Sequence, residues 1–567
     1  MKKIISVLII YIITIFNFVR VQALEINSRY DPREEDRITD IRNQGELGTC
    51  WAFAGIAALE TYLKYNNLGD NDLSEEHMNW WCTPDRNGYG WNRNPDEGSW
   101  AEAVIGYFTS GQGIKSEKDI TYNSSFNGKK PQNMDTAPTL FDVSEIEYLE
   151  NDEKSIKEAI YKYGAVCANY IHSDYFVGND FSSYYDNDLY ADGFKHRIAI
   201  VGWDDNYSKD NFLVQPEKDG AWLIKNSWGD YNKEGGYLWI SYEDCNILRD
   251  PINFAIRKAQ KTDGKHKIYQ HDKYGAISTI NKLDFSEEDN YKKLTCANVY
   301  DFSEEYNKLS SVRIMTGSVG ANYEIAYAKV INNNIDIENK VKLAEGIVEY
   351  CGYMDIETNN FYLPKGKGAI VVTIDYGEKE DLAEIGCEIS REEWNFKAEV
   401  NPNESYILIN DKLVDVTKCK LKNPMNFTIK AITELSSDKL ITNFTIGSYN
   451  MIGLFSNDTF TLSVPEGQDI KDLDLKIAMN NSSSKIVQIG DIKIDKSEYA
   501  GKIKESNFNI LCRAADGSEK TYRVVINKHT DVIEEKSNGI GKVLIFFGIF
   551  IGAFSMVIIY LKSVKKL

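Results

Sequence analysis

The segment that decides the fold of this 567-residue chain reads Asn43-Gln44-Gly45-Glu46-Leu47-Gly48-Thr49-Cys50-Trp51-Ala52-Phe53. Polar and glycine-rich residues lead into Cys50, and apolar residues then recur at helical spacing as far as Tyr65. Thr49 is a residue type that caps helix N-termini, so Cys50 is expected in the first turn of a helix. The positive end of the helix dipole lowers the pKa of a thiol there, and a nucleophilic cysteine needs the thiolate.

A nucleophilic cysteine also needs a base, and His196 is the best candidate. It opens an apolar strand, and the next strand ends at Asn226 beside Trp228. An amide at that place can hold an imidazole in one tautomer, and an indole can shield their bond from water. The two other histidines of this region, His77 and His172, are expected to be structural or surface residues. A lone cysteine or histidine is usually structural, so the prediction depends on the whole set in its order along the chain.

Taken together, Gln44, Cys50-Trp51-Ala52-Phe53, His196 and Asn226-Ser227-Trp228-Gly229 resemble the papain family of cysteine peptidases. Leu73-Ser74-Glu75-Glu76 and the closing Gly235-Gly236-Tyr237 strand match further pieces of that family. The resemblance implies an α+β fold with a helical lobe and a β-barrel-like lobe. It implies that Cys50 attacks the scissile carbonyl, His196 acts as the base and Asn226 orients it. The Gln44 side chain and the Cys50 backbone N–H would stabilise the oxyanion.

The same resemblance implies where substrate binds. Gly98 and Ser99 fall where the family has a glycine rim that pairs with substrate backbone, and Trp228 stands beside the catalytic pair. The first rim glycine is replaced here, so these three substrate contacts follow less directly. Leu47 stands where the family commonly has a cysteine, so that disulfide is absent.

The rest of the chain is β-rich. Short alternating apolar runs between Gly and Asn residues predict two all-β sandwich domains after the peptidase. The first is similar to the lectin-like domain of clostridial-type surface proteins, and the second to immunoglobulin- or cadherin-like modules. The predicted boundaries are 24–258 for the peptidase, 259–435 for the lectin-like domain and 436–528 for the last sandwich.

The two ends predict an exported, membrane-anchored protein. Residues 1–23 have the basic start, apolar run and small-residue end of a signal peptide, with an uncleaved anchor as the alternative. Residues 529–542 are expected to form a stalk, and the uncharged run 543–561 predicts one C-terminal transmembrane helix. The tail 562–567 carries lysines, which places it in the cytoplasm and the domains on the extracellular face of the membrane.

Composition limits the partners. The net charge of −20 argues against nucleic acid, because a phosphate-binding protein needs a cationic face. No cysteine and histidine cluster has zinc spacing, and no cofactor or metal is expected at the site. Carbohydrate or Ca²⁺ at the lectin-like domain stays open, although an acidic solvated surface is the simpler interpretation. Nine cysteines are an odd number, so at least one thiol is unpaired within the chain.

These observations favour an extracellular cysteine endopeptidase that cleaves proteins or peptides at the cell surface. The alternative is a surface adhesin or scaffold that keeps the peptidase fold and the β-domains for binding. A scaffold would not need Gln44, Cys50, His196 and Asn226 together, which favours the enzyme.

Overall fold

The structure is a computed structural model that describes residues 26–125, 128–190, 192–285, 291–421 and 423–529. The predicted signal peptide, membrane segment and cytoplasmic tail lie outside these residues. Within the described part of the chain, no helix is long and apolar enough to cross a membrane. Contacts divide the chain into two compact units, residues 1–436 and 437–567, which are described separately.

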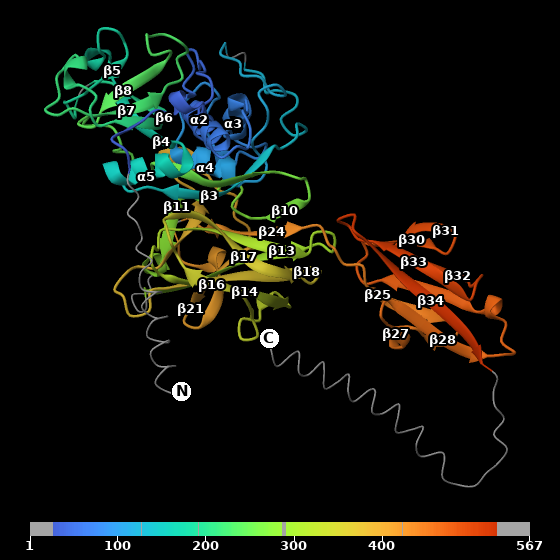
Figure 1. The fold of residues 1–567 in the computed structure, drawn as a ribbon. Coiled ribbons are helices and arrows are strands. Elements are labelled where there is room, and N and C mark those ends of the chain that lie inside the picture. Colours follow the sequence, from blue (N-terminus) through green and yellow to red (C-terminus); the bar gives the residue numbers. More distant parts are fainter. Residues whose placement is uncertain (1–25, 126–127, 191, 286–290, 422, 530–567) are drawn as a thin grey trace, which may run out of the picture. The chain divides into compact units, whose positions relative to one another are not determined.

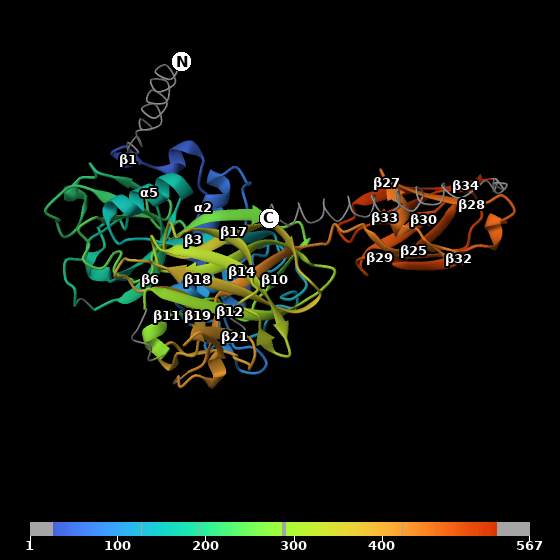
Figure 2. The same cartoon turned by 90° about the horizontal axis from the view of Figure 1, so that it is seen from below.

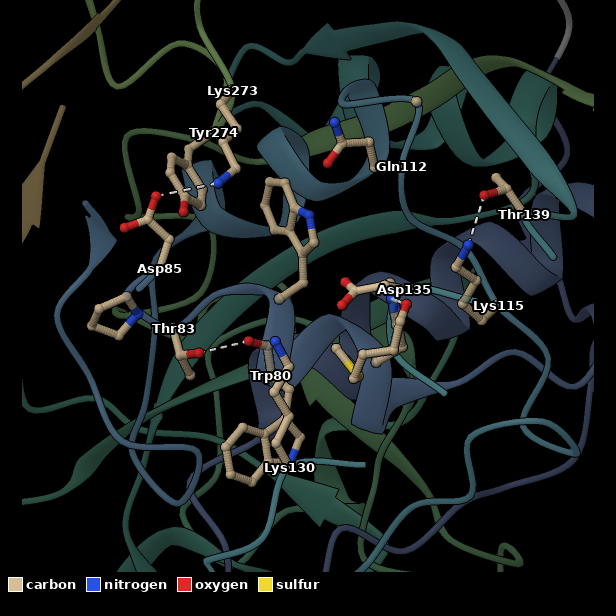
Figure 3. A pocket seen from close by; sticks show the side chains of 15 residues that line it. Trp80, Thr83, Asp85, Gln112, Lys115, Lys130, Asp135, Thr139, Lys273 and Tyr274 are labelled. Atoms are coloured by element: carbon tan, nitrogen blue, oxygen red, sulfur yellow. Dashed lines mark hydrogen bonds and ion pairs between the residues drawn. The ribbon is translucent and has the colours of Figure 1, made fainter. Parts of the chain in front are cut away.

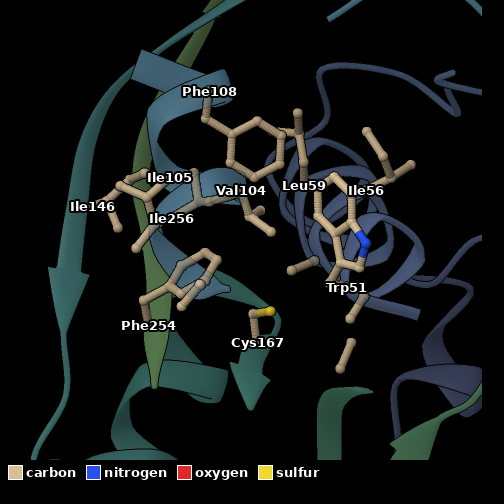
Figure 4. Packing of buried hydrophobic residues seen from close by; sticks show 14 of the residues in the cluster. Trp51, Ile56, Leu59, Val104, Ile105, Phe108, Ile146, Cys167, Phe254 and Ile256 are labelled. Carbon is tan, nitrogen blue, oxygen red and sulfur yellow. The ribbon is translucent and has the colours of Figure 1, made fainter. Parts of the chain in front are cut away.

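Helices dominate the first lobe of the larger unit (Figure 1). The long helix α2 is free of proline and begins at the predicted cysteine, and α3 begins after Ser74, whose hydroxyl accepts a bond from the His77 N–H. Trp51, Ile56 and Leu59 of α2 pack against Val104 and Phe108, the core drawn in Figure 4. The helices of this lobe are α2 (Cys50–Tyr65), α3 (Glu75–Trp81) and α4 (Ala101–Thr109).

Antiparallel strands form most of the second lobe. Strand β6 pairs with β4 on one side and with β7 on the other, and the amphipathic helix α5 buries Ile156 and Ile160 against this sheet. The elements are β1 (Arg29–Tyr30), β2 (Gly90–Trp91), β3 (Phe141–Tyr148), α5 (Glu153–Tyr163), β4 (Val166–His172), β5 (Ser183–Tyr184), β6 (Phe194–Asp204), β7 (Ala221–Lys225), β8 (Tyr237–Ser241) and β9 (Phe254–Lys261).

Residues 266–434 form a second β-rich part of the same unit. Its core lies between β13, β17 and β24 on one side and β12, β14 and β18 on the other. Figure 2 labels β12, β14, β17 and β18 of this part. The strands are β10 (His266–Tyr269), β11 (Ser278–Asn281), β12 (Lys293–Phe302), β13 (Lys308–Thr316), β14 (Asn322–Ile331), β15 (Asn334–Ile335), β16 (Val341–Ile347), β17 (Gly352–Tyr362), β18 (Gly366–Asp375), β19 (Glu384–Ile389), β20 (Phe396–Lys397), β21 (Ser405–Ile409), β22 (Lys412–Asp415), β23 (Met425–Phe427) and β24 (Ile429–Glu434).

The two parts share one sheet. Its order is β10-β24-β13-β17-β3-β9-β4-β6-β7-β8-β5, and the joint is the pairing of β3 with β17 at Ile146 and Tyr353. Strand β9 runs through the predicted boundary after residue 258. The first part of the unit and the part that follows it are therefore fused through backbone hydrogen bonds as well as through packing.

The smaller unit is a two-sheet structure with its own core. Phe444 and Ile477 of one sheet face Phe460, Leu462 and Val524 of the other. Its strands are β25 (Ile441–Ile446), β26 (Tyr449–Asn450), β27 (Phe455–Ser456), β28 (Thr459–Pro465), β29 (Asp474–Met479), β30 (Lys485–Ile489), β31 (Ile492–Lys496), β32 (Glu498–Lys502), β33 (Asn507–Arg513) and β34 (Glu519–His529).

Candidate active site

Cys50 is the first residue of α2, as the sequence predicts. Thr49 occupies the N-cap position but makes no side-chain cap; its hydroxyl lies 2.6 Å from the Tyr122 hydroxyl instead. The backbone N–H groups of Arg197 and Trp51 lie close enough to the thiol to lower its pKa. Because Arg197 follows His196 directly, this contact brings the start of α2 against the start of β6.

His196 is buried and is held by two neighbours. Its Nε2 lies 2.7 Å from Oδ1 of Asn226, which follows the end of β7. The Trp228 ring stacks on the imidazole, with centroids 4.5 Å apart and planes 23° apart. Asn226 is itself fixed, since Oδ1 also accepts from the Ser227 N–H and its amide donates to the Tyr231 hydroxyl at 3.1 Å.

Gln44 is buried beside the same turn. Its backbone N–H donates to the Ser227 carbonyl at 2.8 Å, and its Oε1 accepts from the Ser227 hydroxyl at 2.6 Å. The amide Nε2 therefore points the other way, where it donates to the Leu47 carbonyl at 2.8 Å. The structure thus brings Gln44, Cys50, His196 and Asn226 together from three separate parts of the sequence.

Burial acts on both members of the cysteine and histidine pair. It raises the pKa of the Cys50 thiol, although the backbone N–H groups and the charge of Arg197 lower it. Burial also lowers the pKa of His196 to about 4, against the raising effect of its bond to Asn226. Either charge alone is costly here, whereas a thiolate beside an imidazolium offsets both charges. The helix start alone does not give the low thiol pKa expected from its position.

The cations beside His196 do not account for its lowered pKa. Arg197 turns into the interior, where it pairs with Asp250 at 2.9 Å. Lys195 extends to the surface, and its ammonium lies 5.9 Å from the centre of the Trp100 ring. Burial is the main cause of the lowered pKa of His196, and the neighbouring His172 lowers it further.

The predicted rim at Gly98 and Ser99 lies against the loop that precedes Cys50, which we call the cysteine loop. The Gly48 N–H donates to the Asp96 carbonyl at 2.9 Å, and a Cβ on Gly48 would lie 3.0 Å from the Gly98 nitrogen. A side chain at residue 48 would therefore crowd the rim backbone. Gly98 is exposed with open space beside its Cα, and Ser99 is half-buried.

Two contributors to this region are not evident from the sequence. Arg93 lies over the Trp51 ring and donates to the carbonyls of Asn79, Cys82, Glu97 and Gly98, so it joins α3 to the rim. His172 packs edge-on against Trp228, with centroids 4.8 Å apart. Neither is marked by a local motif, because the ring contacts with Trp51 and Trp228 join residues distant in sequence and the carbonyl contacts of Arg93 depend on the path of the intervening loop.

A separate polar pocket of about 450 Å³ lies elsewhere in the unit (Figure 3). Lys273 and Tyr274 line one side of it, and Lys115 and Thr139 line another. It contains none of the predicted site residues. All nine cysteines lie in the described ranges, and all nine are unpaired.

Comparisons with known proteins agree with this geometry. The family description "Papain family cysteine protease" matches residues 26–255, and "Lectin like domain" matches residues 268–433. Cysteine proteinase 2 of Entamoeba histolytica is 28% identical over 261 residues, which are 41% of this chain and 70% of that protein.

Two solved structures cover more of the chain. A clostridial cysteine protease, Cwp84, after propeptide cleavage is 43% identical and covers 72% of this chain and 100% of its own, with a TM-score of 0.68. The cysteine protease and lectin-like domains of Cwp84, described as a surface-layer associated protein of Clostridium difficile, are also 43% identical. They cover 73% of this chain and 90% of their own, with a TM-score of 0.68.

Proposed function

The chain belongs to the papain family of cysteine proteases, with a lectin-like domain after the protease domain, and on that premise we propose that Cys50, His196, Asn226 and Gln44 are its catalytic residues. The observation that carries this assignment is the convergence of Cys50 and the 2.7 Å pair of His196 and Asn226 at the start of α2.

The proposed reaction is hydrolysis of a peptide bond through an acyl-enzyme. His196 Nε2 is occupied by Asn226, so Nδ1 takes the proton of the Cys50 thiol. The thiolate attacks the carbonyl carbon, and the oxyanion accepts bonds from the Cys50 N–H and the Gln44 amide. When the C–N bond breaks, His196 returns the proton to the leaving amine, and water then releases the acyl group with His196 as the base.

We further propose that Gly98 and Ser99 pair with substrate backbone and that Trp228 both contacts substrate and shields the bond between His196 and Asn226. The exposed Gly98 and the stacked Trp228 support these roles. The open space at Gly98 would let an extended peptide come close to the rim.

The proposed place of action is the outer face of the cell membrane, and the proposed substrates are proteins at or near that surface. The apolar run 543–561 and the surface-layer association of the relative Cwp84 support this. The binding of carbohydrate or Ca²⁺ by the lectin-like domain stays a prediction. Among the described residues, no group of three or more His, Cys, Asp or Glu side chains is arranged to hold a metal ion.

Covalent labelling tests the catalytic assignment. A thiol-directed epoxide should modify Cys50 in the reduced protein and abolish peptide cleavage, and Cys50→Ala should abolish both. Cys245→Ala is the matched control, because Cys245 is also unpaired and half-buried, and it lies after β8 in the second lobe of the protease domain. Cleavage by Cys50→Ala at the rate of the unaltered protein, or labelling confined to other cysteines, would overturn the assignment.

A further inference from the structure

Trp100 connects the rim to the lectin-like domain. It follows Gly98 and Ser99 in the chain, and it is 39% exposed, which is unusual for a tryptophan. Trp394 of the lectin-like domain stacks on it, with ring centroids 5.6 Å apart and planes at 27°. An aromatic side chain from the second domain therefore lies beside a substrate-binding segment of the first.

The backbone on both sides fixes the place of Trp394. It ends the short helix η5 (Glu392–Trp394), and β20 directly after it pairs with β2 of the peptidase part. The Asn92 N–H donates to the Asn395 carbonyl at 2.7 Å. Trp91 packs on Phe396 across this two-stranded sheet, with ring centroids 4.9 Å apart.

The other neighbour of Trp100 leads to the catalytic pair. The ammonium of Lys195 lies 5.9 Å from the centre of the Trp100 ring, and Lys195 is exposed and precedes His196. Gly98 in turn approaches Gly48 of the cysteine loop. A polypeptide that passes from the catalytic pair along the rim would therefore meet Trp100 and then Trp394.

We propose that Trp100 and Trp394 form a composite binding surface for an aromatic or large aliphatic side chain of the substrate. The lectin-like domain then selects substrates for the neighbouring protease site. Stacked indoles offer a broad apolar surface whose ordering has already been achieved by folding, so binding there loses little side-chain entropy. The inference rests on the proposed function, since it extends the proposed substrate path.

A peptide library with the full chain tests this surface. Each peptide carries either Phe or Gly at one position, and kcat/KM is measured for both. For one position of the peptide along the rim, Trp394→Ala should reduce the ratio of kcat/KM for the Phe peptide to kcat/KM for the Gly peptide about tenfold. This is the scale of one apolar contact in a pocket. Trp100→Ala should reduce the same ratio, and the double variant should lose little more than either single variant.

Tyr362→Ala is the matched control, because Tyr362 is an aromatic residue of the lectin-like domain that is 48% exposed. It should keep the ratio, and Trp394→Phe should keep part of it. An unchanged ratio in Trp394→Ala would overturn the inference, and so would an equal loss for every peptide at every position. If the unaltered protein cleaves no peptide and Cys50 resists labelling, the proposed function itself fails and the inference fails with it.

Discussion

At Cys50, two effects act on the thiol in opposite directions. Backbone N–H groups at the helix start lower its pKa, and burial raises it by more. The residue type and its helix position are readable from the sequence, whereas the degree of burial is set by the segments that fold over it. In the proposed mechanism, the reactivity of Cys50 therefore comes from pairing with His196 rather than from the helix alone.

His77 shows the same effect of burial away from the active site. Its ring lies between the Tyr107 hydroxyl at 2.8 Å and the Met134 carbonyl at 3.1 Å, and burial lowers its pKa from 6.5 to about 4. The unfolded chain binds this proton more readily than the folded chain. The stabilising contribution is therefore complete above pH 6.5 and is lost as the pH falls toward 4.

We predict that His77→Gln makes stability less dependent on pH. Over the window from pH 6.5 to 4, the unaltered protein should lose up to about 3 kcal/mol more unfolding free energy than the variant. Urea unfolding at several pH values measures this. His266→Gln, at an exposed histidine, should follow the unaltered protein. Identical pH profiles for His77→Gln and the unaltered protein would contradict the prediction.

At the scale of elements, a few side chains hold the helical lobe to the rim. Arg93 joins the end of α3 to the residues before Gly98, in a region where Leu47 rules out the family disulfide. A planar guanidinium reaches several carbonyls at once, which an ammonium cannot do.

Arg93→Lys should consequently lower the unfolding free energy by about 1–3 kcal/mol, since buried carbonyls lose their donors. The rim would also become less ordered, so KM for peptides should rise more than kcat falls. Arg86→Lys, at an exposed arginine, serves as the control. A variant with unaltered stability and KM would show that the hydrogen bonds of Arg93 to α3 and to the rim, here called the Arg93 clamp, have no energetic role.

Helix α4 meets the lectin-like part at a glycine. A Cβ on Gly106 would lie 1.9 Å from the Tyr274 carbonyl oxygen, closer than any real contact. Gly106→Ala should destabilise the first unit by about 1–3 kcal/mol, the usual cost of overpacking. Thermal unfolding compares it with Gly467→Ala, where the added Cβ meets open space. Equal melting temperatures for the two variants would argue against a rigid contact.

At the scale of the whole molecule, the protease and the lectin-like domain fold as one unit. They share a sheet through β3 and β17, and buried Arg313 of the lectin-like part pairs with Asp142 of the protease part at 2.7 Å. The pattern of short strands predicts two all-β parts after the protease, but it does not show that the first continues the protease sheet.

Truncation tests this unity. A chain that ends at Ser436 should keep peptide cleavage and one cooperative unfolding transition, because its hydrophobic cores are separate from that of the last unit. A chain that ends at Thr262 should lose both, because β3 loses β17, one of its two neighbouring strands, and Asp142 loses Arg313. A stable and active protein ending at Thr262 would contradict the conclusion that the protease and the lectin-like domain fold as one unit.

The sequence by itself predicted the residues that are proposed as catalytic and their order, because a cysteine at a helix start and an amide after a strand are local features. It also indicated a helical start and a β-rich continuation through apolar periodicity. Only the tertiary structure decided the burial of Cys50 and His196, the Arg93 clamp, the fused sheet and the stack of Trp100 on Trp394. The fused sheet and the Trp100 stack depend on contacts between residues far apart in the chain, and no local pattern encodes such distances. The Arg93 clamp joins residues 4 to 14 positions away, but it depends on how the loop between them folds.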